Sequence, residues 1–158
     1  MENRNNLTRI ASFSVNHDYI VPGIYVSRID GDITTYDLRT RRPNEGDYMD
    51  NLTMHSVEHM LATLLRSSEI KDKIIYFGPM GCQTGFYLLV RNADNEETYR
   101  VLLKALSDTV AFTGDMPGES REECGNYENL SLEAAKDECE YYLSQLKSNP
   151  KRFEYPTE

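Results

Sequence analysis

Apolar and β-branched residues alternate with polar ones along the first part of the chain, which is the pattern of β-strands. Residues 24–29 and 33–38 are rich in Ile, Val, Thr and Tyr, and the turn sequence Asp30-Gly31-Asp32 separates them. This arrangement predicts an antiparallel hairpin. The looser alternation of residues 11–16 predicts another strand upstream, with His17 at its end.

Two continuous apolar runs in the middle of the chain, residues 74–77 and 86–90, predict buried strands. They flank a short glycine-rich loop at residues 78–85. Ahead of them, the Pro, Gly and Asn residues of segment 39–47 predict a second loop.

Three other segments repeat apolar residues every three or four positions, which is the spacing of one face of an α-helix. The first helix should begin at Asn51 or Thr53, which are both good N-caps, and end near Arg66. The second should be capped by Asn95 and the third by Ser131.

These elements predict an α+β fold, an antiparallel β-sheet packed against a layer of α-helices, in a single domain over residues 1–158. A chain of this length is long enough to bury one hydrophobic core. The polar tail after Asn149 is expected to be frayed.

The chain is acidic, with 17 Lys and Arg against 26 Asp and Glu and a net charge of -9. This charge repels phosphate backbones and anionic lipids, which argues against nucleic-acid and membrane partners. No apolar run approaches the roughly 18 residues of a membrane span, and the polar start, Met1 to Asn6, does not resemble a signal peptide. Because the cysteines are three in number, we expect free thiols and a cytoplasmic location.

The strongest local motif is His55-Ser56-Val57-Glu58-His59. On a helix, residues i and i+4 lie one turn apart on the same side, so two imidazoles can bind one metal ion there. Glu58 projects beside them, where a carboxylate can move protons. At about 100° per residue the histidines point away from the apolar stripe, which disfavours a core histidine and leaves a solvated polar face as the alternative.

A catalytic site around a tetrahedral metal ion needs a third protein ligand and an open fourth position, and two His plus one Cys form an accepted set. Cys124 is the best candidate, because it precedes Gly125 in a polar loop. Cys139 lies on the apolar stripe of the last helix and is expected to pack in the core.

Cys82 lies at the turn into a strand and is either a reactive thiol or a structural residue. A thiol acts as acid or base near neutral pH only beside a cation or a metal, which Arg39 or a bound ion could supply. His17 could bind a substrate or be a surface histidine bonded to Asp18. The basic cluster at residues 39–42 could bind a carboxylate or be solvated.

Together these residues resemble the LuxS family, the S-ribosylhomocysteine lyases, from about Ser12 to Leu146. The matching segments agree in order and spacing: SFSVNH at 12–17, YDLR at 36–39, RPN at 42–44, HSVEHMLA at 55–62, PMGCQTG at 79–85 and CG at 124–125.

The resemblance implies cleavage of S-ribosylhomocysteine into homocysteine and 4,5-dihydroxy-2,3-pentanedione, the precursor of the autoinducer-2 signal. It implies a role in the activated methyl cycle and in quorum sensing. It also implies one divalent metal ion per subunit, Fe(II) in the native form and often Zn(II), and a homodimer with its sites at the interface.

The family's functional residues are carried over by position. The metal ligands would be His55, His59 and Cys124. The acid/base residues would be Glu58 and Cys82, and the substrate pocket would contain Ser12, His17 and Arg39.

Two competing functions remain at this point. One is a small metal hydrolase of the inverted zincin type, in which Glu58 activates water against an amide. The chain is short for that class and shows no obvious distal acidic ligand. The other is a domain with a structural metal, although such sites are normally closed by four protein ligands.

Overall fold

The computed structural model describes residues 7–157, so the polar start at Met1 to Asn6 lies outside the described residues. It contains one four-stranded antiparallel sheet in the order β1-β2-β4-β3. The strands are β1 (Gly23–Asp30), β2 (Ile33–Arg39), β3 (Ile74–Pro79) and β4 (Gly85–Arg91). The α-helices are α1 (Asn51–Leu65), α2 (Asn95–Ala111) and α3 (Leu132–Ser148). The predicted α+β class, the predicted hairpin of residues 24–38 and the two predicted buried strands are therefore confirmed.

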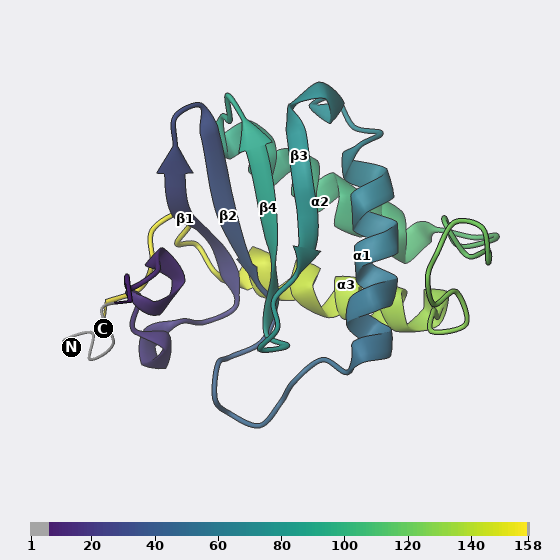
Figure 1. Cartoon of the computed structure of the whole chain (residues 1–158), viewed down its shortest axis with the longest axis horizontal. Coiled ribbons are helices and arrows are strands. Elements are labelled where there is room, and N and C mark those ends of the chain that lie inside the picture. The colour runs from purple at the N-terminus through teal and green to yellow at the C-terminus, as the bar shows by residue number, and fades with distance from the viewer. Residues whose placement is uncertain (1–6, 158) are drawn as a thin grey trace.

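The helices lie on one side of the sheet. Helices α2 and α3 cover its back, and α1 stands beside the edge strand β3 (Figure 1). Alternate residues of the central strands, such as Tyr36 and Leu88, are fully buried against Leu61, Leu102 and Tyr142 of the three helices. The period-2 pattern of the strands and the apolar stripes of the helices thus meet in one core.

The opposite face of the sheet carries none of the three α-helices (Figure 1). Tyr76 pairs with Leu89, and Tyr87 pairs with Asp37 on the neighbouring strand, so these residues share that face. Tyr76 is 49% exposed. The sheet therefore has one face in the core and one face that reaches the surface. Within residues 7–157, none of the helices is long and apolar enough to cross a membrane.

Helix α1 begins at Asn51, as predicted, but the N-cap residues of α1 and α2 differ from the predicted ones. Asp50, not Asn51 or Thr53, is the N-cap of α1, and its carboxylate accepts from the Thr53 amide. Asp94 rather than Asn95 caps α2 in the same way. Asp and Asn cap equally well, so propensity alone could not choose between adjacent ones. The predicted cap of α3, Ser131, is confirmed.

The strand predicted at residues 11–16 is wrong. The segment forms two short 3-10 helices, η1 (Ala11–Phe13) and η2 (His17–Tyr19), so His17 is not at a strand end. Asn16 caps η2 by accepting from the Asp18 amide. Phe13 is 65% exposed, so the alternating residues have no buried face that would hold them as a strand.

Candidate metal centre and active site

His55 and His59 lie one turn apart on α1, with ring centroids 4.6 Å apart. The Nδ1 of His55 lies 2.8 Å from the carbonyl oxygen of Asn129, and the Nδ1 of His59 lies 2.9 Å from that of Pro117. A carbonyl only accepts, so each Nδ1 carries a proton, and in the neutral ring the lone pair is therefore on Nε2. Both rings are half-buried and held, which excludes a freely solvated polar face.

The α2–α3 loop, residues 112–131, supplies both carbonyls and reaches α1 closely at Gly118. Gly118 has φ +74, and a Cβ there would lie 2.8 Å from Nδ1 of His59. A side chain at this position would be strained and would press on the imidazole. Gly118 therefore lets the loop bind and orient the ring.

Cys124, from the same loop, completes the cluster. Its Sγ lies 3.4 Å from Nε2 of His55, and the ligand atoms of His55, His59 and Cys124 all lie within 4.8 Å of one another. The amide of Asn126 also points at this sulfur, at 3.4 Å. Two imidazoles with fixed tautomers and one thiolate suit a tetrahedral divalent ion with an open position. The three residues could bind one metal ion.

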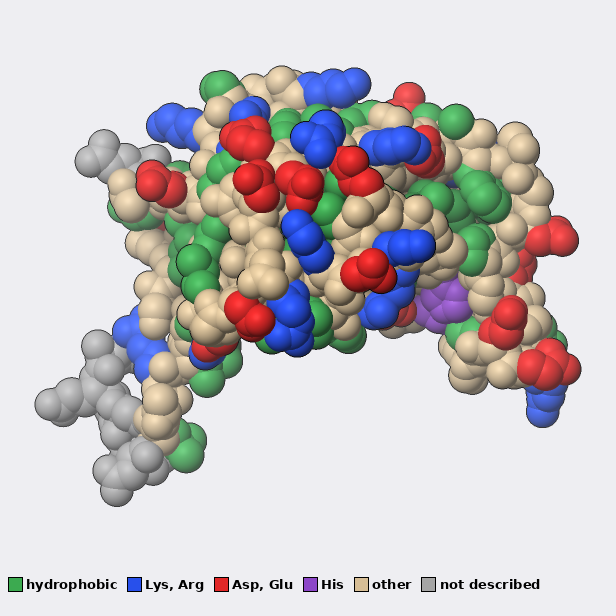
Figure 2. Space-filling view, turned by 90° about the horizontal axis from the view of Figure 1, so that it is seen from above, with side chains coloured by type: hydrophobic (Ala, Val, Ile, Leu, Met, Phe, Trp, Pro, Cys, Tyr) green, Lys and Arg blue, Asp and Glu red, His purple; other side chains and the backbone are tan. Residues whose placement is uncertain are grey.

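Glu58 borders an open hollow beside this cluster. The hollow has a volume of about 230 Å³ and is lined by Asn51, Met54, His55, Glu58, Pro79, Asn126 and Asn129. Figure 2 shows histidine side chains in a recess between the body of the molecule and the lobe formed by the α2–α3 loop. The side of α1 that carries Glu58 is therefore open to a small molecule.

Cys82 is exposed on the turn between β3 and β4. The turn is closed by the Met80 amide, which donates to the Gly85 carbonyl at 2.9 Å, and Gln83 adopts a left-handed φ of 69. A Cβ on Gly85 would lie 2.6 Å from the carbonyl oxygen of Leu38, so only glycine allows this close approach to β2. The glycine-rich loop thus presents the thiol beside the end of β2.

Arg39, at that end of β2, lies next to Cys82. One guanidinium nitrogen, Nη1, donates to Oγ1 of Thr84 at 2.8 Å and lies 3.9 Å from Sγ of Cys82. Burial lowers the pKa of Arg39, but the charge and hydrogen bonds of Asp37, with the charge of Cys82, outweigh it and leave the pKa raised. The cation beside the thiol is therefore permanent.

Ser12, His17 and Arg39 line one small cavity, together with Val15, Ile20, Asp37, Tyr87 and Tyr155. His17 does not bond to Asp18; its Nδ1 donates to the carbonyl oxygen of Val15 at 2.9 Å. The predicted substrate residues are thus neighbours.

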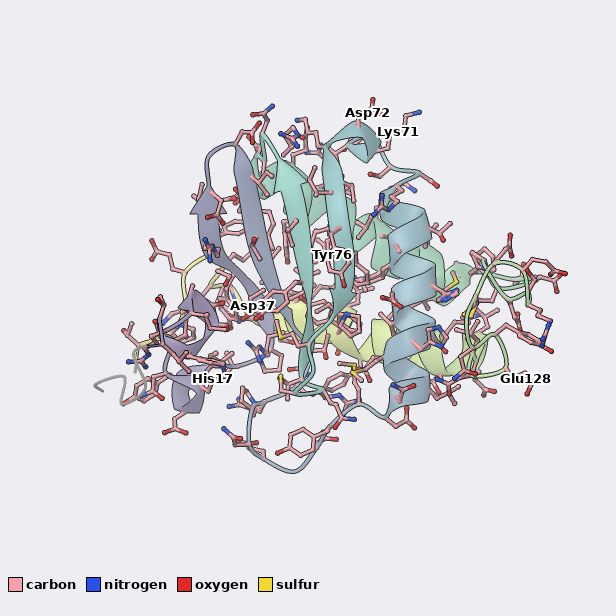
Figure 3. All side chains as sticks on the ribbon, in the orientation of Figure 1. His17, Asp37, Lys71, Asp72, Tyr76 and Glu128 are labelled. Atoms are coloured by element: carbon pink, nitrogen blue, oxygen red, sulfur yellow. The ribbon has the colours of Figure 1, made fainter. Side chains whose placement is uncertain are left out.

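This cavity lies far from the metal-site loop. Figure 3 shows His17 and Glu128, a residue of the α2–α3 loop, at opposite ends of the molecule.

Two side chains of the Cys82 region were absent from the sequence-based set. Thr84 is 1% exposed, and its hydroxyl oxygen lies 3.0 Å from Sγ of Cys82. Asp37 is 2% exposed and forms a two-point ion pair with Arg39. Asp37 could have been found from the sequence, because it lies two positions before Arg39 on the same strand. Residues i and i+2 of a strand point to the same face.

The other basic residues and the third cysteine lie elsewhere. Arg41 forms ion pairs with Glu138 of α3 and with Asp47, so the basic cluster does not act as one unit. Cys139 is 1% exposed in the core, as predicted, and burial raises the pKa of its thiol to about 12.

Comparisons with known proteins decide the family. A family model described as S-ribosylhomocysteinase (LuxS) matches residues 10–153. The chain belongs to the LuxS family. A protein named S-ribosylhomocysteine lyase from Clostridium beijerinckii is 42% identical, over 95% of this chain and 99% of its own length. Proteins of the same name from Desulfotalea psychrophila and Borrelia garinii subsp. bavariensis are 41% and 40% identical, and both are covered over 100% of their length.

This LuxS chain is therefore an enzyme, a carbon–sulfur lyase. The similarity spans nearly the whole chain, so it includes both the histidines of α1 and the Cys82 turn. The family match ends at residue 153, ahead of the last described residues.

Proposed function

We propose that this LuxS chain cleaves S-ribosylhomocysteine into homocysteine and 4,5-dihydroxy-2,3-pentanedione. The observation that carries the proposal is the open cluster of His55, His59 and Cys124 beside Glu58, in a chain of this family. Three ligands with an open position suit catalysis better than a structural site, which four protein ligands normally close.

The metal site would hold one divalent ion per subunit, Fe(II) in the native enzyme and Zn(II) as an alternative. The two Nε2 atoms and the Cys124 sulfur would be its ligands. A bound ion supplies Lewis-acid polarisation of the sugar oxygens.

The substrate explains why two proton-transfer residues are needed. Its sugar carries the carbonyl carbon at C1 and the sulfur at C5, so the sulfur is not β to a carbonyl at the start. Two successive shifts move the carbonyl to C2 and then to C3, and each transfers one proton between neighbouring carbons. Removal of the C4 proton then expels the C5 sulfur as the thiolate of homocysteine, which takes up a proton. The remaining C4 enol gains a proton at C5 and loses its hydroxyl proton, which gives the dione.

Cys82 is assigned the carbon protons of the two shifts. As a thiolate beside the permanent charge of Arg39, it can take a proton from one carbon and return it to the next. Glu58 borders the metal-site hollow and is assigned the protons of the sugar oxygens and the elimination step. Ser12, His17 and Arg39 are assigned to the substrate pocket, because they line one cavity.

A homodimer with its sites at the interface is part of this proposal. The His17 cavity and the α2–α3 loop lie at opposite ends of one chain (Figure 3), and a second subunit can bring one set to the other. Two aromatic side chains are exposed, Tyr76 (49%) on the sheet face without α-helices and Phe13 (65%) in η1. Gel filtration at micromolar concentration should give the mass of two chains, and a single-chain mass contradicts the dimer.

We place the reaction in the cytoplasm, with roles in the activated methyl cycle and autoinducer-2 production, because the site needs two reduced cysteines. Cys82 and Cys124 are free in the structure, and a reducing compartment keeps exposed thiols in that state.

The test is to incubate the metal-loaded protein with S-ribosylhomocysteine and to measure free thiol and the dione product together. Equal amounts of homocysteine and 4,5-dihydroxy-2,3-pentanedione are expected. Cleavage of a peptide substrate without any thiol release would instead favour the metal hydrolase.

A further inference from the structure

The end of the chain is docked on the sheet. The Phe153 amide donates to the carbonyl of Ile24 at 2.8 Å, and the Val26 amide donates to the carbonyl of Phe153 at 2.9 Å. Phe153 thereby forms a parallel bridge on the free edge of β1. The prediction of a frayed tail after Asn149 is therefore wrong. The contacts that hold the tail are tertiary, so the local sequence does not indicate them.

Side chains anchor the same segment at further points. The guanidinium of Arg152 lies 4.4 Å from the centre of the Tyr99 ring and pairs with Glu96 at 3.2 Å. The Asn149 amide donates to the carbonyl of Pro22 at 3.0 Å. Phe153 has a φ of 76, which costs a non-glycine residue about 1 kcal/mol. The segment is therefore held in a specific conformation against local strain.

This conformation brings Tyr155 against Asp37. The Tyr155 ring stacks on Tyr25, with centroids 5.0 Å apart and planes 23° apart. Its hydroxyl donates to Oδ2 of Asp37 at 2.7 Å. Burial, and then the charge of Asp37, raise the pKa of Tyr155. Tyr155 consequently keeps its proton, and Asp37 is the acceptor.

Asp37 in turn orients Arg39. Its Oδ2 accepts from Nη2 of Arg39 at 2.6 Å and its Oδ1 from Nε at 3.1 Å, and both side chains are at most 3% exposed. This two-point pair leaves Nη1 as the guanidinium nitrogen that faces Thr84 and Cys82. A continuous set of polar contacts thus leads from Tyr155 to the thiol.

We infer that Tyr155 is a positioning residue, which fixes the Asp37 carboxylate so that Arg39 is held beside the Cys82 sulfur. This inference rests on the proposed role of Cys82. Tyr155 lies two residues beyond the stretch, residues 10–153, that matches the family model. This positioning role explains why a strained terminal segment is docked on the sheet edge nearest to Arg39.

The variant Tyr155→Phe keeps the stacking ring and removes only the hydroxyl. Without that donor the Asp37–Arg39 pair loses one of its anchors, and the guanidinium spends less time beside the thiol. We expect alkylation of Cys82 by iodoacetamide at pH 7 to slow by about three- to tenfold, the range of one hydrogen bond. The kcat for thiol release should fall by a similar factor, with little change in KM.

Tyr36→Phe is the matched control. Tyr36 is fully buried, and its hydroxyl donates to Oδ1 of Asn95 at 2.6 Å, at the start of α2. This control should lower the melting temperature and leave the alkylation rate of Cys82 unchanged. Peptide mass spectrometry separates Cys82 from Cys124 and Cys139 in both variants.

A lower melting temperature of Tyr155→Phe with a parental alkylation rate would overturn the inference and leave the segment a purely structural one. A double-mutant cycle gives a second decision, because Tyr155→Phe should have no further effect on alkylation in an Arg39→Lys background. An undiminished effect there contradicts the inference. Alkylation needs no turnover, so failure of the proposed lyase reaction is detected separately by the absence of thiol release.

Discussion

The two halves of the candidate site are built in different ways. At the metal centre, main-chain carbonyls of the α2–α3 loop hold the rings of His55 and His59. At the Cys82 turn, a buried ion pair between Asp37 and Arg39 holds the charge next to the thiol. The first half depends on the path of a loop, and the second depends on the pairing of two side chains that are at most 3% exposed.

Substitutions in the two halves should therefore have different consequences. Damage to the metal centre should lose the ion and leave the core of the sheet intact, because the ligands are only half-buried. Damage to the ion pair should leave an unpaired buried charge and weaken the fold itself.

The largest expected effect is loss of the metal in Cys124→Ser. A hydroxyl is a poor replacement for a soft thiolate, and two imidazoles alone do not make a catalytic set. Metal per chain should fall below about one tenth, and thiol release should fall by about a thousandfold or more. Elemental analysis and the melting curve check this together, and retention of a full metal complement would contradict the ligand assignment.

The next largest effect is on stability, in Asp37→Asn. The substitution keeps the shape and leaves the Arg39 charge buried without its partner, which should cost about 3–5 kcal/mol of unfolding free energy. Urea unfolding measures it. Asp32→Asn is the matched control, because Asp32 pairs with Arg91 in a bridge in which both side chains are about half exposed, 48% and 47%, and should change little. Equal midpoints for the two variants would remove the contrast between the regions.

A smaller effect on metal affinity tests the contribution of the loop conformation, with all three ligands left in place. Gly118→Ala should weaken metal binding by about ten- to a hundredfold, as for other supporting contacts of a metal ligand. Gly114→Ala is its control, since Gly114 also has a positive φ, of +107, but has open space around its Cβ position. Metal titration of the two apoproteins decides, and identical affinities would show that Gly118 does not act through His59.

The smallest effect at neutral pH concerns Cys139, which belongs to neither half. Burial raises the pKa of its thiol from 9.0 to about 12. Above pH 9 the unfolded chain loses this proton and the native chain keeps it, so stability should fall as the pH rises from about 9 to about 12. Cys139→Ala should lose less stability than the parent over that range in pH-dependent urea unfolding. Parallel stability curves for the two proteins would contradict a buried Cys139 thiol with a raised pKa.

How far the sequence predicted this molecule depends on the range of each interaction. The stripe of α1 and the spacing of His55, Glu58 and His59 follow from helix geometry alone, so they could be placed in advance. The α2–α3 loop could not be folded from its composition, so neither the Asn129 and Pro117 carbonyls nor the need for a glycine at 118 was visible.

The Cys82 half shows the same limit. Pattern placed Arg39 at the end of a strand and Cys82 on a turn, but their proximity depends on the pairing of Arg39 with Gly85 across β2 and β4. Asp37 reads as an exposed charge until the tail covers it. The docking of Tyr155 joins positions 118 residues apart in the chain, a distance over which local propensity carries no information.

The most direct test of the account is thiol release from S-ribosylhomocysteine by metal-loaded Cys82→Ala, with metal content measured on the same sample. The two halves have separate supports, so the variant should keep one metal ion per chain. Loss of the proton-transferring thiol should nevertheless slow homocysteine release by at least a hundredfold. Release at the parental rate from a fully metal-loaded Cys82→Ala variant would contradict the central claim that the Cys82 half carries the proton transfers.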